Sequence, residues 1–191
     1  MNLFDFKTSL RPAPGLLLVS EPMLPDPNFE RSIILLCAHD TEGSFGFVLN
    51  KPSGKNVSEL VDGFAGLHAQ VFTGGPVELN TLHFIHCFPE IEGGLEIRDG
   101  IYWGGDIDSL RELAAIGKCT PEHVRFFLGY SGLSGGHLDD ELKENTWIVS
   151  GNVDRSLIFE TVTDEMWKKA MIILGGRFSI YANYPTDPRL N

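Results

Sequence analysis

Cysteine is scarce in this sequence, and the three that it contains exclude two classes of protein. Cys37, Cys87 and Cys119 are too few and too scattered to form the disulfide framework of a small secreted domain. No C-x-x-C pair is present, so the ligand spacing typical of structural zinc sites is missing. An odd number of cysteines is typical of a protein from a reducing compartment.

Long apolar runs are missing as well. The first twenty residues contain no basic segment followed by an apolar core, and the run GLLLV at 15–19 is too short for a signal peptide or a membrane span. The sequence therefore predicts a cytoplasmic protein with no membrane partner.

Basic residues are the third shortage. The chain has 15 Lys and Arg against 26 Asp and Glu, which gives a formal net charge of −11. Such an acidic surface repels the phosphates of nucleic acids and of anionic lipids, so we expect no direct binding to nucleic acid. A protein partner, a cation, a small molecule or a second copy of the chain stays open as a partner.

The chain has 191 residues, of which 42% are apolar and 21% charged, as in ordinary folded domains. A chain of this length buries about 70% of its unfolded surface, so it needs neither disulfides nor a metal to fold. We expect one domain over residues 1–191. Pro12 and Pro14 favour an irregular arm at 1–14, and an irregular tail is expected at 177–191.

Apolar runs separated by turn-forming residues predict short strands and helices in an irregular order. The letters RDG supply the turn of a hairpin at 94–105. Asn56 and Glu59 have the spacing of a capping box, and Thr163 is a candidate helix cap. Adjacent hairpins favour an α+β fold, with helices packed outside a mixed, largely antiparallel sheet. The other expected strands are 15–20, 31–39, 43–51, 69–75, 79–87, 123–130 and 147–152, and the expected helices are 56–64, 106–117, 135–146 and 163–176. The segment 156–160 is expected to be a strand or a buried segment.

The letters GLSGG at 132–136 match G-x-S-x-G, the signature of the nucleophile elbow of serine hydrolases. Such enzymes need an acid and then a histidine after the serine. His137 is the only histidine that follows Ser134, and no acid lies between them. A chain with 21 glycines also matches the pattern easily. We interpret the glycines as a left-handed turn before a capped helix, and keep catalysis by Ser134 and His137 as the alternative.

Metal-ligating side chains are densest at His83, His86 and Cys87. Residues 83 and 86 of a strand point to opposite faces, so the two histidines cannot hold one ion together. Cys37 and His39 share a face, but two ligands do not make a zinc site. The sequence therefore predicts no metal site and no cofactor.

Three turns form a candidate binding surface if they converge in the fold. Glycine permits a ligand to approach the backbone closely, and polar groups at strand ends can line a cleft. Whether these turns meet depends on the arrangement of the strands. The candidate binding residues are Asn50, Pro52, Gly74, Gly75, Pro76, Gly132, Gly136 and His137.

Four segments, taken in order, resemble the AlgH/YqgE-like bacterial proteins. Residues 15–52 join an apolar strand, a proline-rich turn with Asp-Pro-x-Phe, a second apolar strand ending in His, and a closing G-x-x-L-N-x-P. Residues 72–86 contain GGPV followed by Leu-His, and residues 101–110 contain a Gly-Gly-Asp helix entry. Residues 125–142 contain GYSGLSGGHLDDEL. The resemblance covers nearly the whole chain.

This resemblance implies an α+β fold whose sheet curls toward a pseudo-barrel, in a family whose biochemical activity is not established. The name of one member ties it to the regulation of alginate production, which implies a role as a transcriptional regulator. Some positions depart from the family pattern: Leu133 stands where Trp is usual, Gly135 where Pro or a small residue is common, and His137 where Gln is usual. Ser134 occupies a position that the family does not reserve for serine.

Two functions from different classes are therefore weighed. The first is a regulatory or interaction protein that acts by binding, through a partner rather than on DNA directly. The alternative is a small-molecule enzyme that uses the glycine-rich turns as a pocket, with Ser134 as the nucleophile of a hydrolase. An enzyme requires titratable groups that converge in a deep pocket.

Overall fold

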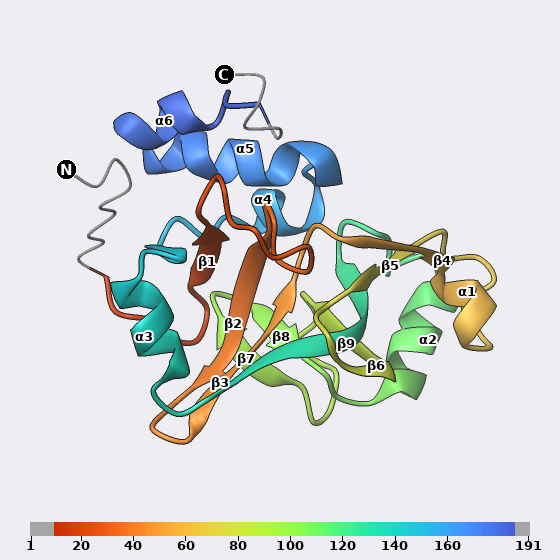
Figure 1. Ribbon diagram of the computed structural model, residues 1–191. Helices are drawn as coiled ribbons and strands as arrows, with labels where there is room; N and C mark the ends of the chain where they lie inside the picture. Colours follow the sequence, from red (N-terminus) through yellow and green to blue (C-terminus); the bar gives the residue numbers. More distant parts are fainter. Residues whose placement is uncertain (1–9, 186–191) are drawn as a thin grey trace.

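The computed structural model describes residues 10–185, which form ten strands and six helices (Figure 1). Most of the predicted amino-terminal arm and the end of the predicted tail lie outside these residues. The strands are β1 (Leu17–Ser20), β2 (Ile33–His39), β3 (Gly43–Val48), β4 (Pro52–Asn56), β5 (Gln70–Thr73), β6 (Val77–His86), β7 (Leu95–Arg98), β8 (Ile101–Trp103), β9 (Val124–Ser134) and β10 (Trp147–Ser150). The helices are α1 (Val57–Leu60), α2 (Ile107–Ala115), α3 (His137–Lys143), α4 (Arg155–Phe159), α5 (Thr163–Leu174) and α6 (Arg177–Tyr181).

All ten strands belong to one mixed sheet. The main path runs β10-β1-β2-β3-β9-β6-β8-β7, and every pairing along it is antiparallel. β5 lies beside this path, parallel to β9 and antiparallel to β4. β10 and β7 are the two ends of the path and do not pair with each other among the described residues, so the sheet is open rather than a closed barrel. The predicted α+β fold with a mixed, largely antiparallel sheet is confirmed.

The eleven-residue strand β9 organises the sheet, because it pairs with three other strands. Its first half pairs with β5 and β6, and its last four residues pair with β3. Gly129 follows the last residue of β9 that pairs with β5 and has a φ of 69°. A Cβ at this position would lie 2.7 Å from the carbonyl oxygen of Val77, so only glycine fits here. Figure 1 shows β9 crossing the molecule between the two halves of the sheet.

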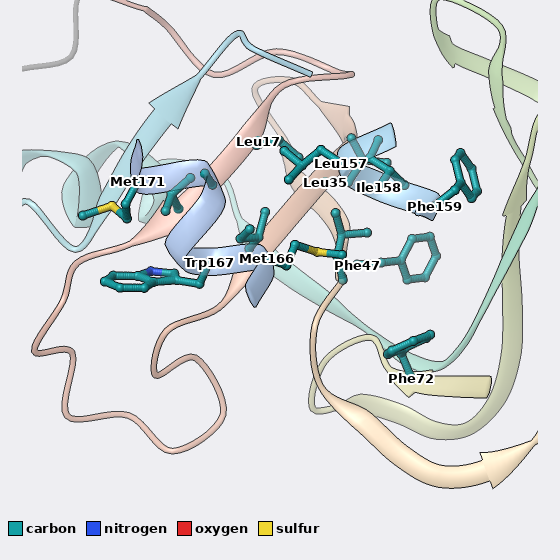
Figure 2. Packing of buried hydrophobic residues seen from close by; sticks show 14 of the residues in the cluster. Leu17, Leu35, Phe47, Phe72, Leu157, Ile158, Phe159, Met166, Trp167 and Met171 are labelled. Carbon is teal, nitrogen blue, oxygen red and sulfur yellow. The ribbon is translucent and has the colours of Figure 1, made fainter. Parts of the chain in front are cut away.

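The largest apolar cluster lies between the sheet and the carboxyl-terminal helices. Figure 2 shows Met166 and Trp167 of α5 close to Leu17 and Leu35 of the sheet. All four side chains are buried, and burying each one contributes about 1.5–3 kcal/mol to the free energy of unfolding. The apolar runs of β1 and β2 therefore reflect strands that are covered by helices.

A second apolar cluster lies at the other end of the sheet, under α1 and α2. Phe64, Leu110 and Phe126 are fully buried there, and the rings of Phe64 and Phe126 meet edge to face with centroids 5.5 Å apart. β9 contributes to both clusters, because Phe126 faces this one and Phe127 faces the first. Successive residues of one strand, whose side chains point to opposite faces, thus connect the two clusters.

Four predicted helices are present as α1, α2, α3 and α5. The predicted capping box of α1 is confirmed: Asn56 Oδ1 accepts from the N–H of Ser58 at 3.3 Å, and Glu59 Oε2 accepts from the N–H of Asn56 at 2.5 Å. Thr163 does not cap α5. It is the first helical residue, and the cap position belongs to Val162, whose side chain cannot accept a hydrogen bond.

Three local predictions miss the structure. Of the two alternatives predicted for 156–160, the strand is wrong, because this segment forms α4, whose first turn is capped by Asp154 Oδ1 accepting from the N–H of Ser156 at 3.1 Å. The alternative of a buried segment agrees with the structure, since three residues of α4 are buried. Strand β4 is not predicted: Pro52 begins it instead of closing the preceding strand. Helix α6 lies within the tail that is predicted to be irregular.

Candidate functional site

The G-x-S-x-G motif lies mainly in a strand. β9 continues through Gly132 and ends at Ser134, which pairs with Gly43 of β3. The predicted left-handed turn is therefore shorter than expected, because β3 supplies a pairing partner as far as Ser134. No side chain caps α3, so a cap from Ser134 is not formed. Only Gly135 and Gly136 form the turn, and Gly136, with a φ of 84°, precedes α3.

Close packing explains the glycines of this motif. A Cβ on Gly135 would collide with the carbonyl oxygen of Thr41 in the β2–β3 turn, and a Cβ on Gly132 would lie 3.1 Å from the ring of Tyr130. Gly136 has a left-handed conformation that other residues rarely adopt. These glycines let the end of β9 and the β2–β3 turn approach each other, so their presence does not require a nucleophile.

Ser134 and His137 do meet. The Oγ atom of Ser134 lies 2.8 Å from Nδ1 of His137, and both side chains are exposed. No described carboxylate forms a hydrogen bond with the imidazole, and Asp140, an acid of the same helix, pairs with Lys143 at 2.8 Å. A nucleophile–base pair needs a third group that orients the base. The arrangement is therefore a serine–histidine pair without the third member of a triad.

A hollow of about 430 Å³ lies beside this pair, between the β2–β3 turn and α3; we call it the α3 hollow. A second serine–histidine contact forms part of its wall, with Ser44 Oγ 2.8 Å from Nδ1 of His39. Asp40 and Asp139 give the hollow its negative charge, and no Lys or Arg lines it. Its lining residues are His39, Asp40, Thr41, Gly43, Ser44, Gly136, Leu138 and Asp139.

Asn50 and Pro52, two of the predicted binding residues, lie away from the α3 hollow. The side-chain carbonyl of Asn50 accepts from the N–H of Ile33 at 3.0 Å, and its amide donates to the carbonyl of Arg31 at 2.8 Å. These two bonds hold the chain leading into β2, so the polar atoms of the side chain are occupied. Pro52 pairs with Phe72 of β5.

The Gly74–Pro76 turn packs against the middle of β9. The carbonyl of Gly74 accepts from the N–H of Val48 at 2.8 Å and from Ser131 Oγ at 3.0 Å, and a Cβ on Gly75 would collide with the backbone of Tyr130. This turn therefore reaches the same strand as Gly132. Of the predicted binding residues, only Gly136 lines the α3 hollow, and His137 follows it in the chain.

The histidines of β6 have separate surroundings. His86 is fully buried: its Nε2 donates to the carbonyl of Gly104 at 2.8 Å, and its Nδ1 accepts from the N–H of Phe88 at 3.2 Å. His83 lies among aromatic rings, 5.3 Å from that of Phe47. Among residues 10–185, no three His, Cys, Asp or Glu side chains are placed to hold a metal ion.

A second pocket contains a residue that the sequence analysis overlooked. Arg125 of β9 has only 6% of its surface exposed, and its guanidinium lies 3.8 Å from the centre of the Phe72 ring. It borders a pocket of about 360 Å³ between β5 and the α4–α5 connection, which we call the Arg125 pocket. The lining residues are His68, Ala69, Gln70, Phe72, Pro121, Val124, Arg125, Phe159, Glu160, Thr161, Val162 and Thr163.

The guanidinium of Arg125 is held by carbonyl groups and has no acidic partner. Nε and Nη2 donate to the carbonyl of Leu49 at 3.1 and 2.8 Å, and Nη1 donates to the carbonyl of Ile158 at 2.7 Å. Burial lowers the pKa of Arg125 to about 10, which leaves the group charged at neutral pH. A buried charge without a counter-charge is costly, so this residue stands out from the other arginines. The sequence signal was one basic residue inside the apolar run VRFFL.

Together, an open α+β sheet, a serine–histidine pair without a carboxylate and two surface hollows define the class: a globular domain with no assembled triad among its described residues. The sequence model of the AlgH-like family matches residues 17–179. A "UPF0301 protein" of Chlorobium limicola is 41% identical over the full length of both chains, and one of Bacteroides thetaiotaomicron is 36% identical over 94% of this chain and 92% of its own. The chain belongs to the AlgH-like family.

Two solved structures are similar to this one. A protein from Corynebacterium diphtheriae matches with a TM-score of 0.82 and 19% identity over 95% of this chain and 97% of its own, which concerns the fold alone. The AlgH protein from Pseudomonas aeruginosa matches with a TM-score of 0.70 and 28% identity over 90% of this chain and 93% of its own. No helix within residues 10–185 is long and apolar enough to cross a membrane.

Proposed function

We propose that this protein is a regulatory or interaction protein, and that it binds a basic side chain of a protein partner in the α3 hollow. The observation that carries the proposal is the charge of this hollow. Asp40 and Asp139 line it, and no Lys or Arg does, although His39 is part of its wall. A partner's Lys or Arg would bring the complementary charge, which favours both encounter and correct orientation.

Local bonds prepare the hollow for such a partner. Oδ1 of Asp40 accepts from the N–H groups of Glu42 at 2.8 Å and Gly43 at 3.2 Å, so the turn holds this carboxylate in place. Asp139 is exposed in the first turn of α3 and forms no ion pair with a described residue. Leu138 and the His39–Ser44 contact give the hollow a firm wall. Because these groups are already held in place, binding a partner costs little conformational entropy.

Site-specific photocrosslinking tests this proposal. A benzophenone amino acid replaces Thr41, which lines the hollow, and a matched variant carries it at Ala115, an exposed residue of α2. In living bacteria, we expect the Thr41 probe to form a discrete adduct with one polypeptide that the Ala115 probe does not form. With that polypeptide purified, D139N should weaken binding by about threefold to tenfold, because one facing charge is lost.

A matched control separates the hollow from the overall charge of the chain. Asp164 is exposed in the first turn of α5, as Asp139 is in that of α3, so D164N makes the same chemical change elsewhere. D164N should leave the affinity unchanged. Equal adducts from the Thr41 and Ala115 probes, or equal losses from D139N and D164N, would refute the proposal.

The alternative function, a serine hydrolase, has one observation in its favour: the 2.8 Å contact between Ser134 and His137. A serine activated by this histidine would react with a fluorophosphonate probe, and the label would disappear in S134A. We expect no labelling of the folded protein, because no described carboxylate orients the imidazole. Stoichiometric labelling that S134A abolishes would establish the enzyme instead.

A further inference from the structure

The Arg125 pocket has unused hydrogen-bond donors at its base. A guanidinium carries five N–H donors. Those of Arg125 form three hydrogen bonds, two to Leu49 and one to Ile158, and Nη1 and Nη2 each take part in only one of them. Each terminal nitrogen therefore keeps one N–H with no acceptor among the described residues. A guanidinium with free terminal donors matches a carboxylate or a phosphate.

The amino terminus of α5 lies at the rim of the same pocket. α5 has twelve residues, and its cap residue Val162 provides no side-chain hydrogen bond. The N–H groups of Thr163 and Asp164 have no acceptor among the described residues, and both Val162 and Thr163 line the pocket. Free amides at the positive end of a helix form a second group of donors for an anion.

The acids near the pocket do not neutralise the charge of Arg125. Glu160 lines the pocket, and Asp164 and Glu165 lie in the first turn of α5, but all three are exposed. None forms an ion pair with Arg125, whose pKa is lowered by burial alone. The buried positive charge is thus uncompensated within the described chain.

We propose that the Arg125 pocket binds a small organic oxyanion, a molecule with one carboxylate or phosphate group on a compact apolar body. The head group accepts from the free N–H donors of Arg125 and of the first turn of α5. The body contacts Phe72 and Phe159, whose rings lie at one end of the apolar cluster in Figure 2. A pocket of about 360 Å³ is of the size that small ligands occupy.

This site is independent of the proposed function. Arg125 and the α3 hollow lie toward opposite ends of β9, and no residue lines both. A protein partner in the α3 hollow and a small anion in the Arg125 pocket can therefore each fail without the other. If both sites exist, the protein can hold its protein partner in the α3 hollow while the anion occupies the Arg125 pocket.

Titration with matched probes tests the site. Benzoate and phenyl phosphate supply the two head groups, and benzamide supplies the same ring without charge. We expect the two anions to shift the NMR signals of the Thr163 and Asp164 amides and of the Arg125 Nε–H in a saturable manner, while benzamide leaves them unchanged. The stronger of the two anions identifies the preferred head group. Equal, non-saturable shifts from all three probes would refute the site.

Variants of the rim show whether these atoms bind the anion. V162D replaces an exposed valine, so the variant should fold. The new aspartate is a good helix cap, so its carboxylate accepts from the free amides of the first turn of α5 and adds a negative charge there. We expect V162D to weaken binding of the better probe by about tenfold, the effect of losing one charge-assisted hydrogen bond. E160Q removes a repelling charge and should strengthen binding by about twofold to threefold.

A variant of the arginine completes the test. R125Q removes the charge but keeps donors for the carbonyls of Leu49 and Ile158, and binding of both anions should disappear. If R125Q does not fold, V162D and E160Q still decide, because both positions are at the surface. Unchanged affinity in V162D, or weaker binding in E160Q, would overturn the proposal.

Discussion

The two ends of β9 keep their polar groups in opposite states. Near the end of β9, Ser134 is exposed and bonds to His137, three residues further along the chain. Near the start of β9, Arg125 is buried and bonds to carbonyls of Leu49 and Ile158, which are distant in sequence. Losing an exposed hydrogen bond between residues that are close in sequence changes the free energy of unfolding little. A buried charge, in contrast, must be held in place by the tertiary structure.

This difference shows which residues the fold constrains. Within the motif that resembles an elbow, Ser134 is exposed and can be replaced with little consequence, whereas the glycines are constrained by close packing and Leu133 packs against an apolar cluster. Arg125 carries no motif, yet it joins three elements: β9, the segment after β3, and α4.

Replacement of Phe72 tests the rigidity of the Arg125 pocket. Phe72 is 5% exposed and lies under the guanidinium, so F72A removes a buried ring and a cation–π contact. We expect a loss of about 3–5 kcal/mol in the free energy of unfolding, measured by urea denaturation. The conservative F72L should cost less than about 1.5 kcal/mol. T41A, at the exposed rim of the α3 hollow, should change stability by less than about 0.5 kcal/mol. Equal effects of F72A and T41A would contradict this view of the two regions.

Replacement of Gly135 tests whether packing explains the glycines of the motif. A Cβ at this position would meet the carbonyl of Thr41, so G135A should cost about 1–3 kcal/mol by urea denaturation. Gly66 is the matched control, because a Cβ there meets nothing within 4 Å and its backbone is not left-handed. G66A should be neutral or stabilising by up to about 1 kcal/mol. If G135A did not lower the free energy of unfolding, the turn at Gly135 and the β2–β3 turn could move apart, and close packing would not explain this glycine.

Alternation and turn chemistry predicted much of the fold. The apolar runs of β1, β2 and β9 and the capping box at Asn56 depend on neighbours in sequence, and the structure contains them. The segment 156–160 was harder, because SLIFE is apolar enough for a strand and only the Asp154 cap reveals a helix. The extension of β9 to Ser134 depends on pairing with β3, which no local pattern records.

The candidate sites were less predictable for the same reason. The Ser134–His137 contact could be inferred from sequence, since the two residues are three apart. The Arg125 pocket joins residues from 68 to 163, and Arg125 forms no ion pair with a described acid, although Glu122 is three residues before it in the chain and Glu160 lines the same pocket. Its importance comes from burial, a property that arises only when the sheet and the α4–α5 connection are assembled.

The buried His86 predicts how stability depends on pH. Burial lowers its pKa in the folded protein, although the carbonyl of Gly104 and the charge of Glu90 oppose this effect. The unfolded chain therefore binds more protons as the pH falls through about 6.5, and the free energy of unfolding decreases below that pH. The slope from one such group is at most about 1.4 kcal/mol per pH unit. Urea denaturation between pH 8 and pH 5, about the range where histidine titrates, measures it.

His86 can be separated from other groups by substitution. H86Q keeps a polar side chain without the titration, so its stability should vary less with pH than that of the parent protein. The attribution to His86 fails if H86Q and the parent protein lose stability in parallel as the pH falls.

Removal of the serine–histidine contact should have the smallest effect of all. Both side chains are exposed, and in S134A and H137A each remaining partner can bond to water, so neither variant should change the free energy of unfolding by more than about 0.5 kcal/mol. The double variant should equal the sum of the two single variants, because an exposed local bond adds little coupling. A coupling above about 1 kcal/mol would instead mean that the pair is held as firmly as Arg125, as a catalytic pair must be. Urea denaturation of the parent protein, the two single variants and the double variant measures this coupling. The result decides whether the polar groups at the end of β9 are held as firmly as Arg125 near its start.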